Sequence, residues 1–316
     1  MNSDIGILIT NIGSPDAPTT SAVRRYLKQF LTDPRVVEIP RLIWYPILYG
    51  LILPFRSKKS ATLYQKIWTP HGSPLTILSQ ELAEKLQAIL NRPVEIGMHY
   101  GNPSINVALE NLRKQQVKKI IVLPLYPHYS ASTTAATFDR VTKILGTKRA
   151  IPEIQVLGDY ADHPAYIQAV SESIMNAWKT REKPQHLLFS FHGLPKRFCE
   201  LGDPYEDRCK LTARLIAEKL QLPEDFWSIA FQSRVGKAKW LAPYTDQVLK
   251  TFPQKGIRQL DVVCPGFAVD CLETLEEIAI RGKEQFISAG GKFFNYIPAL
   301  NSTDAQINTL RQILQL

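Results

Sequence analysis

The chain has 316 residues, of which 45% are hydrophobic and 21% are charged. This composition fits one large or two medium globular domains and excludes a disordered or fibrous protein. The 38 lysines and arginines exceed the 29 aspartates and glutamates, and the resulting net charge of +9 favours an anionic small molecule, membrane surface or nucleic acid as partner.

Apolar runs that predict buried strands alternate with amphipathic stretches that predict helices along most of the chain. The predicted strands span residues 6–10, 94–98, 119–123, 187–191, 229–232 and 260–264. The predicted helices span residues 21–30, 79–90, 105–115, 164–178, 208–220 and 274–288. This alternation is typical of an α/β fold with parallel sheets.

Two pairs of segments repeat one another. Residues 7–15 (ILITNIGSP) and 187–195 (LLFSFHGLP) are apolar runs that end in Gly-x-Pro, while 119–127 and 260–267 are strand-like runs stopped by proline. The repeats predict two similar halves, 1–162 and 163–302. Since ligands bind beyond the carboxyl ends of parallel strands, we expect the four turns to face one cleft between the halves.

Several features predict a cytoplasmic protein. The N-terminus lacks the features of a signal peptide, and the four cysteines, at positions 199, 209, 264 and 271, form no CxxC pair. The longest uncharged stretch, residues 42–55, is broken by Pro46, Gly50 and Pro54 and is too short to span a bilayer. GxGxxG, P-loop, GxSxG and HExxH motifs are missing, and no element has a stripe of basic residues interleaved with aromatic ones, so neither nucleotide nor nucleic acid is expected.

His192 is the leading candidate for chemistry because it stands where a predicted strand gives way to a turn. An imidazole there can accept a proton or bind a metal, although a hydrogen-bonded structural histidine is the alternative. Asp270, Glu273 and Glu277 have the spacing of one helical face, which predicts either a solvated acidic helix start or a carboxylate row beside a cation. Together with His192, Glu273 would suit Fe²⁺.

Basic residues follow the apolar stretch directly. Arg56, Lys58 and Lys59 come after Phe55, and an apolar lip beside a basic patch suits a flat ligand with carboxylates, or a membrane surface. A buried helix followed by a solvated turn is an equal alternative. The aromatic residues that could line such a site are Tyr64, Tyr126, Tyr129 and Trp240.

The segment LLFSFHGLPKRFCELGDPY (187–205) strongly resembles the signature of ferrochelatases, which insert Fe²⁺ into protoporphyrin IX. The similarity continues in family order through ILITNIGSPDAP, YLKQFLTDPRVVEIP, GSPL, VLPLYPHYSASTT, FQSRVGKAKWLAPYTD and CPGFAVDCLETLEEI, and covers nearly the whole chain. The resemblance implies the class II chelatase fold of two Rossmann-like halves, with porphyrin in the cleft and a last helix, residues 303–316, packing on the first half.

The resemblance also implies roles for individual residues. His192 is similar to the family's active-site histidine and Glu273 to its partner carboxylate, while Glu277 is a secondary candidate for binding metal. Arg56 and Lys59 resemble contacts to the porphyrin propionates, and the apolar region 42–55 resembles the lip that faces the membrane. The other positions that resemble porphyrin contacts are Ile12, Tyr64, Tyr126, Ser130 and Trp240.

Three departures from the family pattern affect these expectations. Ala131 occupies the position where some members have a cluster cysteine, so no iron-sulfur cluster is expected and Fe²⁺ enters only as substrate. Cys271 stands where some members have a histidine, and Arg281 ends the acidic row, which leaves the route of iron entry open. The segment MHY (98–100) also differs from the arginine-bearing version in other members.

The expected activity is therefore a lyase-class insertion of Fe²⁺ into protoporphyrin IX, the last step of haem biosynthesis, by bending the macrocycle and removing its pyrrole protons. His192 is either the base or a metal ligand. The alternatives are a tetrapyrrole or metal carrier without catalysis, a coproporphyrin III or cobalt chelatase of the same fold, and a sugar-nucleotide transferase. Peripheral contact with an anionic surface, the inner face of the cytoplasmic membrane, is expected.

Overall fold

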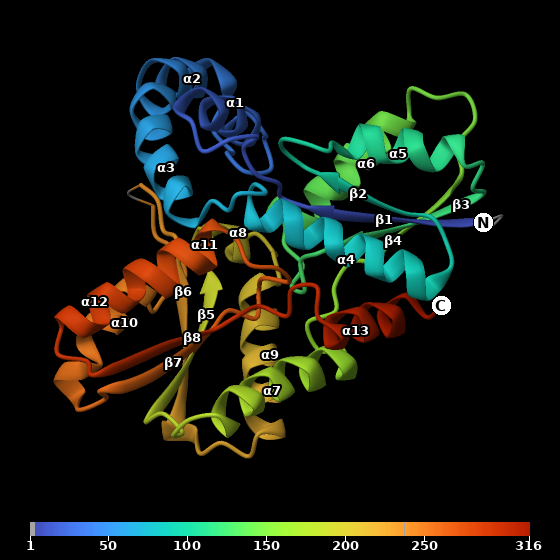
Figure 1. The fold of residues 1–316 in the computed structure, drawn as a ribbon. Helices are drawn as coiled ribbons and strands as arrows, with labels where there is room; N and C mark the ends of the chain where they lie inside the picture. The colour runs from blue at the N-terminus through green and yellow to red at the C-terminus, as the bar shows by residue number, and fades with distance from the viewer. Residues whose placement is uncertain (1–3, 237) are drawn as a thin grey trace. The chain divides into compact units, whose positions relative to one another are not determined.

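The computed structural model describes residues 4–236 and 238–316, which form two compact units (Figure 1). The first unit contains the chain up to residue 125, residues 130–158 and Leu316, and the second contains 126–129 and 159–315. The main division thus falls at 158/159, four residues before the expected one at 162/163.

The first unit is built on a four-stranded parallel sheet in the order β2-β1-β3-β4. Its strands are β1 (Ile5–Asn11), β2 (Val94–Met98), β3 (Lys119–Pro124) and β4 (Glu153–Val156). Its helices are α1 (Thr20–Leu31), α2 (Arg41–Ile47), α3 (Leu53–Ile67), α4 (Pro74–Leu90), α5 (Ile105–Lys114) and α6 (Ala136–Leu145), with π-helical turns at Leu48–Ile52 and Ala131–Ala135. α4 lies on one face of the sheet, and α5 and α6 lie on the other (Figure 1).

The second unit repeats this architecture with the strand order β6-β5-β7-β8. Its strands are β5 (His186–His192), β6 (Trp227–Gln232), β7 (Gln259–Val263) and β8 (Phe293–Ile297). Its helices are α7 (Pro164–Lys179), α8 (Lys196–Glu200), α9 (Tyr205–Lys219), α10 (Thr245–Thr251), α11 (Leu272–Thr274), α12 (Lys283–Ser288) and α13 (Asp304–Leu314), with a π-helix at Leu275–Gly282 and 3-10 turns at Glu224–Phe226 and Pro253–Lys255. α10 and α12 cover one face of the sheet, and α7 and α9 cover the other (Figure 1).

The repeat that the sequence predicted is confirmed by the strand orders. β1 and β5 hold the same place in their sheets, as do β3 and β7. The turns that follow β1 and β5 both need glycine, because a backbone oxygen lies too close for a side chain. A Cβ on Gly13 would lie 1.8 Å from Tyr100 O, and one on Gly193 would lie 2.6 Å from Gln232 O.

All six predicted strands are confirmed, but the short edge strands β4 and β8 were missed. Each is a terminal strand of its sheet, so it has only one neighbouring strand. β4 is also too exposed to have the apolar pattern of a buried strand, since none of its residues is buried. In β8 only Phe294 and Ile297 are buried. The edge strands β2 and β6 have more buried residues and were predicted, so it is the low burial of β4 and β8 that weakens their apolar pattern in the sequence.

The last helix, α13, belongs to the second unit in this structure. It packs along α7, and Thr309 Oγ1 donates a hydrogen bond to Ala165 O at 3.3 Å. This placement differs from the expectation that residues 303–316 pack on the first half. Among the described residues, no helix combines the length and the apolar character needed to cross a membrane.

The helix predicted over residues 274–288 is not a single α-helix. It consists of α11, the π-helix at Leu275–Gly282, and α12. Within the π-helix, Arg281 reaches Glu276, five residues earlier, with Nε at 3.2 Å and a terminal nitrogen at 3.1 Å from Oε2. This spacing matches the i to i+5 period of a π-helix, a form that occurs frequently at functional sites.

Candidate functional site

His192 is the last residue of β5, a central strand of the second sheet. From β5 the chain crosses to β6 on one side, and then returns past β5 to β7 on the other. The carboxyl ends of β5 and β7 therefore flank the point where the direction of winding reverses, which is where open α/β sheets bind ligands. The predicted position of His192 at the end of a strand is confirmed.

The surroundings of the His192 ring define which nitrogen carries the proton. Nδ1 lies 2.6 Å from Gly193 O, and a carbonyl oxygen can only accept a hydrogen bond. In the neutral ring, Nδ1 therefore carries the proton, and Nε2 keeps the lone pair that can accept a proton or bind a metal. The backbone of the same residue is held by Tyr205, whose hydroxyl donates to His192 O at 3.0 Å.

The turn after β5 is fixed by the neighbouring strand β6. Gly193 N donates to Gln232 O at 2.7 Å, and this close approach leaves no room for a side chain at position 193. Trp240 packs against the same turn, because its ring would lie 3.1 Å from a Cβ on Gly193. Its indole Nε1 donates to Val235 O at 2.9 Å. The structure thus brings the predicted Trp240 beside the HGLP turn.

Gln232 is a residue of this site that sequence reasoning missed. It is 2% exposed, and its amide nitrogen donates to Glu273 O at 2.7 Å while Oε1 accepts from Ser190 Oγ at 2.8 Å. The side chain thereby ties α11, which carries Glu273, to β5 and β6. The only signal in the sequence was its place in FQSRVGKAKW, directly after a predicted strand.

Glu277 lies on the π-helix, and its carboxylate is clamped by Ser233. Ser233 N donates to Oε1 at 2.9 Å, and Ser233 Oγ donates to Oε2. Burial raises the pKa of the Glu277 carboxyl above its ordinary value, while Ser233 and the charges of Arg281 and His192 oppose the shift. His192 and Glu277 are therefore close enough to interact electrostatically within the second unit.

The expected acidic row of Asp270, Glu273 and Glu277 is wrong at its first member. Asp270 lies before α11, ahead of the N-cap residue Cys271, whose backbone is extended, and so it is not on the helix. Its carboxylate accepts hydrogen bonds from Thr274 Oγ1 at 2.8 Å and Tyr296 Oη at 2.6 Å, and also from Asn301 Nδ2 at 2.8 Å. Asp270 therefore holds loops together and offers no free carboxylate.

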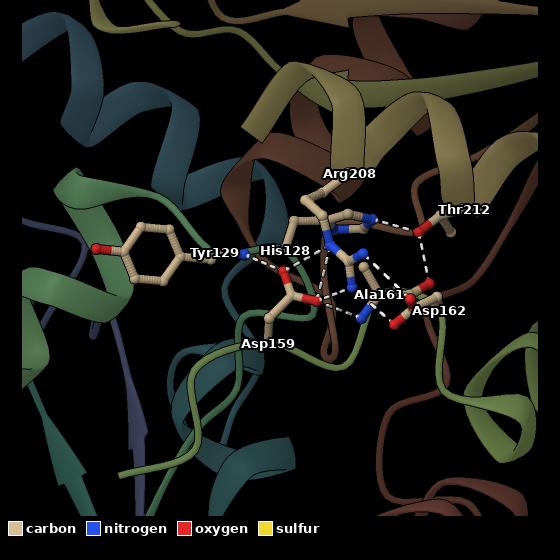
Figure 2. A network of polar contacts seen from close by, with 7 residues as sticks. All are labelled: His128, Tyr129, Asp159, Ala161, Asp162, Arg208 and Thr212. Atoms are coloured by element: carbon tan, nitrogen blue, oxygen red, sulfur yellow. Dashed lines mark hydrogen bonds and ion pairs between the residues drawn. The ribbon is translucent and has the colours of Figure 1, made fainter. Parts of the chain in front are cut away.

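Residues 126–129, which carry the predicted Tyr126, are anchored to α9 by a network of polar contacts (Figure 2). Asp159 accepts from Tyr129 N at 2.8 Å and from Arg208 Nε at 3.0 Å, and Arg208 also pairs with Asp162 at 2.7 Å. His128 Nε2 lies 2.8 Å from Thr212 Oγ1. The network fixes the side chain of His128 and the backbone that directly follows it.

The remaining predicted porphyrin contacts lie in the first unit. Arg56, Lys59 and Tyr64 are on α3, where Lys59 is exposed, Arg56 is half-buried and Tyr64 is buried. Ile12 directly follows β1, and Ser130 caps the π-helical turn Ala131–Ala135 by accepting from Ser132 N at 3.3 Å. Each residue is thus placed within its own unit.

The apolar stretch 42–55 folds as α2, a π-helical turn and the start of α3. Its large side chains are unusually exposed, with Leu42 at 93%, Phe55 at 74%, and Ile43 and Leu51 each at 59%. Contiguous apolar side chains in water mark interaction surfaces in proteins. The alternative interpretation, a buried helix, is wrong for these residues.

No group of three or more His, Cys, Asp or Glu side chains that could hold a metal is found within residues 4–236 and 238–316. The four cysteines are free, and Cys209, Cys264 and Cys271 are buried. Burial raises the pKa of each of these three thiols well above its ordinary value. Such thiols stay protonated and are poor metal ligands.

Comparison with known proteins gives one consistent family. Residues 4–316 match the family model described as Ferrochelatase. The chain is 51% identical to the ferrochelatase of Nitrosococcus oceani, with 98% of this chain and 86% of that protein covered. It is 52% identical to the ferrochelatase of Methylococcus capsulatus, with 98% and 95% covered.

Solved structures support the fold alone. SirB from Bacillus subtilis, in a structure with Fe³⁺, is 12% identical with a TM-score of 0.58, covering 98% of this chain and 94% of that one. CbiX, described as the terminal enzyme of sirohaem biosynthesis in denitrifying bacteria, is 12% identical with a TM-score of 0.53, covering 98% and 97%. The expected class II chelatase fold is thereby confirmed.

Proposed function

The chain belongs to the ferrochelatase family, and on this premise we propose that its second unit carries the chemistry through His192. The protein is a lyase-class metallochelatase that inserts Fe²⁺ into protoporphyrin in haem biosynthesis. The observation that carries the proposal for His192 is its position at the carboxyl end of β5, with Nδ1 bonded to Gly193 O.

The reaction exchanges one Fe²⁺ for two pyrrole protons, so the protein must accept positive charge as the metal enters. His192 Nε2 accepts a proton, since Nδ1 already carries one. Glu277 has a raised pKa and lies near His192, so it is suited to take the first proton onward from the imidazolium, which frees Nε2 to accept the second. Glu273 acts beside it as the partner carboxylate, held in place through its backbone by Gln232.

The residues that we propose to bind the macrocycle are those that the family resemblance implies. Arg56 and Lys59 pair with the two propionates, because guanidinium and ammonium groups are the usual partners of carboxylates. The side chains that we propose to contact the macrocycle through apolar or hydroxyl groups are Ile12, Tyr64, Tyr126, Ser130 and Trp240. Bending the ring exposes the pyrrole nitrogens to the base and to the metal.

Iron is substrate here, and we propose no iron-sulfur cluster and no other permanent cofactor. Ala131 stands at the expected cluster position, and the thiols of Cys209, Cys264 and Cys271 are buried with raised pKa values. Nucleotide and nucleic acid are likewise not partners in this proposal, since their binding motifs are missing from the sequence.

The test is anaerobic incubation with protoporphyrin IX and Fe²⁺, or Zn²⁺ as a surrogate, followed through the porphyrin spectrum. We expect His192→Ala to abolish turnover while porphyrin affinity stays within about tenfold of the wild type. His163→Ala, which changes a histidine at the start of α7, is the matched control and should keep activity. Stoichiometric binding without insertion, equal in wild type and His192→Ala, would instead identify a carrier.

The exposed side chains of residues 42–55 support a peripheral contact with the inner face of the cytoplasmic membrane. Burying one large apolar side chain contributes about 1.5–3 kcal/mol. Replacing Leu42 and Phe55 by serine should therefore lower binding to anionic vesicles at least about tenfold. Turnover of detergent-dissolved porphyrin is the control, because it measures the chelatase activity of the variant without vesicles. Vesicle binding equal to that of the wild type would refute the membrane contact.

A further inference from the structure

The outer edge of β2 has unsatisfied hydrogen-bonding groups between two capped positions. Ile7 N donates to Pro93 O and His99 N donates to Asn11 O, each at 2.8 Å. Because hydrogen-bonding directions alternate along a strand, the backbone groups of residues 93, 95, 97 and 99 face β1, and those of 94, 96 and 98 face outward.

Two of the outward N–H groups are capped within the unit. Gln87 Oε1 accepts from Val94 N at 3.1 Å, and Pro103 O accepts from Met98 N at 2.6 Å. Between them, Ile96 N–H and C=O have no hydrogen-bond partner within the part of the chain that the structure describes, although Ile96 is only 5% exposed. Buried backbone groups are nearly always paired, so this pair indicates an occupant.

A cavity opens at this edge of the sheet. Its volume is about 320 Å³, at the lower end of the range for ligand pockets, and it is lined by Ile96 together with residues of α4 and α5. These helices lie on opposite faces of the sheet (Figure 1), so the cavity is a groove that runs along the strand edge between them.

The groove carries a charge opposite to that of the whole chain. Glu84 on α4 and Glu95 on β2 line it, and their recorded partners are amides: Gln80 for Glu84 at 3.0 Å, and Asn111 for Glu95 at 3.0 Å. No ion pair involves either carboxylate among residues 4–236 and 238–316. The net charge of the protein is +9, so two uncompensated carboxylates here favour a cationic occupant.

We propose that the groove binds an extended basic segment of a partner protein, which pairs its backbone with Ile96 and its cationic side chains with Glu84 and Glu95. Successive side chains of a strand point to opposite faces, so two adjacent basic residues reach both carboxylates, one on the side of α4 and one on the side of α5. The free N–H and C=O of Ile96 explain why the segment must be extended.

The probe is fluorescein-labelled Val-Arg-Arg-Val-amide, followed by anisotropy with the full chain at low salt. We expect saturable binding that weakens about two- to fivefold in Glu84→Gln and again in Glu95→Gln, the range for exposed ion pairs. Glu182→Gln, an exposed change of the same charge in the second unit, is the control and should bind as the wild type does. Exchange of the amides in residues 94–98 should slow with the probe bound.

Two further probes separate strand addition from simple charge attraction. Val-Glu-Glu-Val-amide and a Val-Arg-Arg-Val-amide with N-methylated backbone nitrogens should both fail to bind. Equal binding of the N-methylated probe, equal binding to Glu84→Gln, or no binding of the first probe overturns the proposal. Insertion of iron by the Glu84→Gln variant should equal that of the wild type, so failure here is distinct from failure of the chelatase assignment.

Discussion

His128 provides a direct test of the polar network that anchors residues 126–129 (Figure 2). Thr212 Oγ1 donates to Ala161 O at 2.7 Å, so it must accept the hydrogen of His128 Nε2 at 2.8 Å. His128 is 2% exposed, and its Nδ1 has no hydrogen-bond partner within residues 4–236 and 238–316. Burial therefore lowers the pKa of His128 to about 3.

The lowered pKa makes the stability of the second unit depend on pH. The folded protein keeps His128 neutral, whereas the unfolded chain binds a proton at the ordinary pKa of 6.5. The contribution of this residue is thus fully present above pH 6.5 and is lost as the pH falls toward about 3. At pH 5 linkage predicts a loss of about 2 kcal/mol in the free energy of unfolding relative to pH 8.

The variant His128→Gln isolates this contribution, because its amide can still donate to Thr212 but does not titrate. Urea unfolding followed by circular dichroism at pH 5 and pH 8 gives the two free energies for each protein. The fall between pH 8 and pH 5 should be about 2 kcal/mol smaller in the variant. His99, with a pKa lowered to about 4, is present in both proteins and cancels. Equal falls in both proteins would refute the reasoning.

Two further predictions concern the second unit. Gly193→Ala places a Cβ 2.6 Å from Gln232 O. We therefore expect the free energy of unfolding to fall by about 1–3 kcal/mol and the rate of metal insertion to fall clearly. Unchanged turnover would contradict the argument. Arg281→Leu removes the guanidinium that pairs with Glu276, a residue that is 1% exposed. We expect the free energy of unfolding in urea at pH 7 to fall by about 1–3 kcal/mol. Arg214→Leu is the control, because it removes an ion pair with Glu218 in which both side chains are exposed, and it should have little effect.

The strands, the repeat and the position of His192 could be predicted because their signals are local. A buried central strand needs a continuous apolar run, and the Gly-x-Pro turns end two such runs at equivalent points. His192 follows from the same pattern, since the residue before the glycine is the last of its strand. These features depend on neighbouring residues in sequence, which the chain itself displays.

The features that escaped prediction depend on contacts between distant residues. The spacing of Asp270, Glu273 and Glu277 fits an α-helix, but Tyr296 and Asn301 draw the first carboxylate into a loop network. The π-helix widens the turn that carries Glu277, and Ser233 from another strand end clamps it. Helical spacing alone cannot show either contact.

The internal repeat explains why one unit is assigned the chemistry. Aligning Gly13 with Gly193 places Ile12 and His192 at the same position, directly before a glycine packed against the neighbouring strand. Both side chains are half-buried at the carboxyl end of the corresponding central strand. The shared turn therefore supplies the position, and the residue type sets the role: an apolar side chain can only contact a macrocycle, whereas an imidazole can also take its proton. Ile12→His in a His192→Ala background tests whether a histidine at the equivalent turn is sufficient for activity. We expect no metal insertion by this variant, because the Glu277 carboxylate and the Ser233 that binds it belong to the second unit.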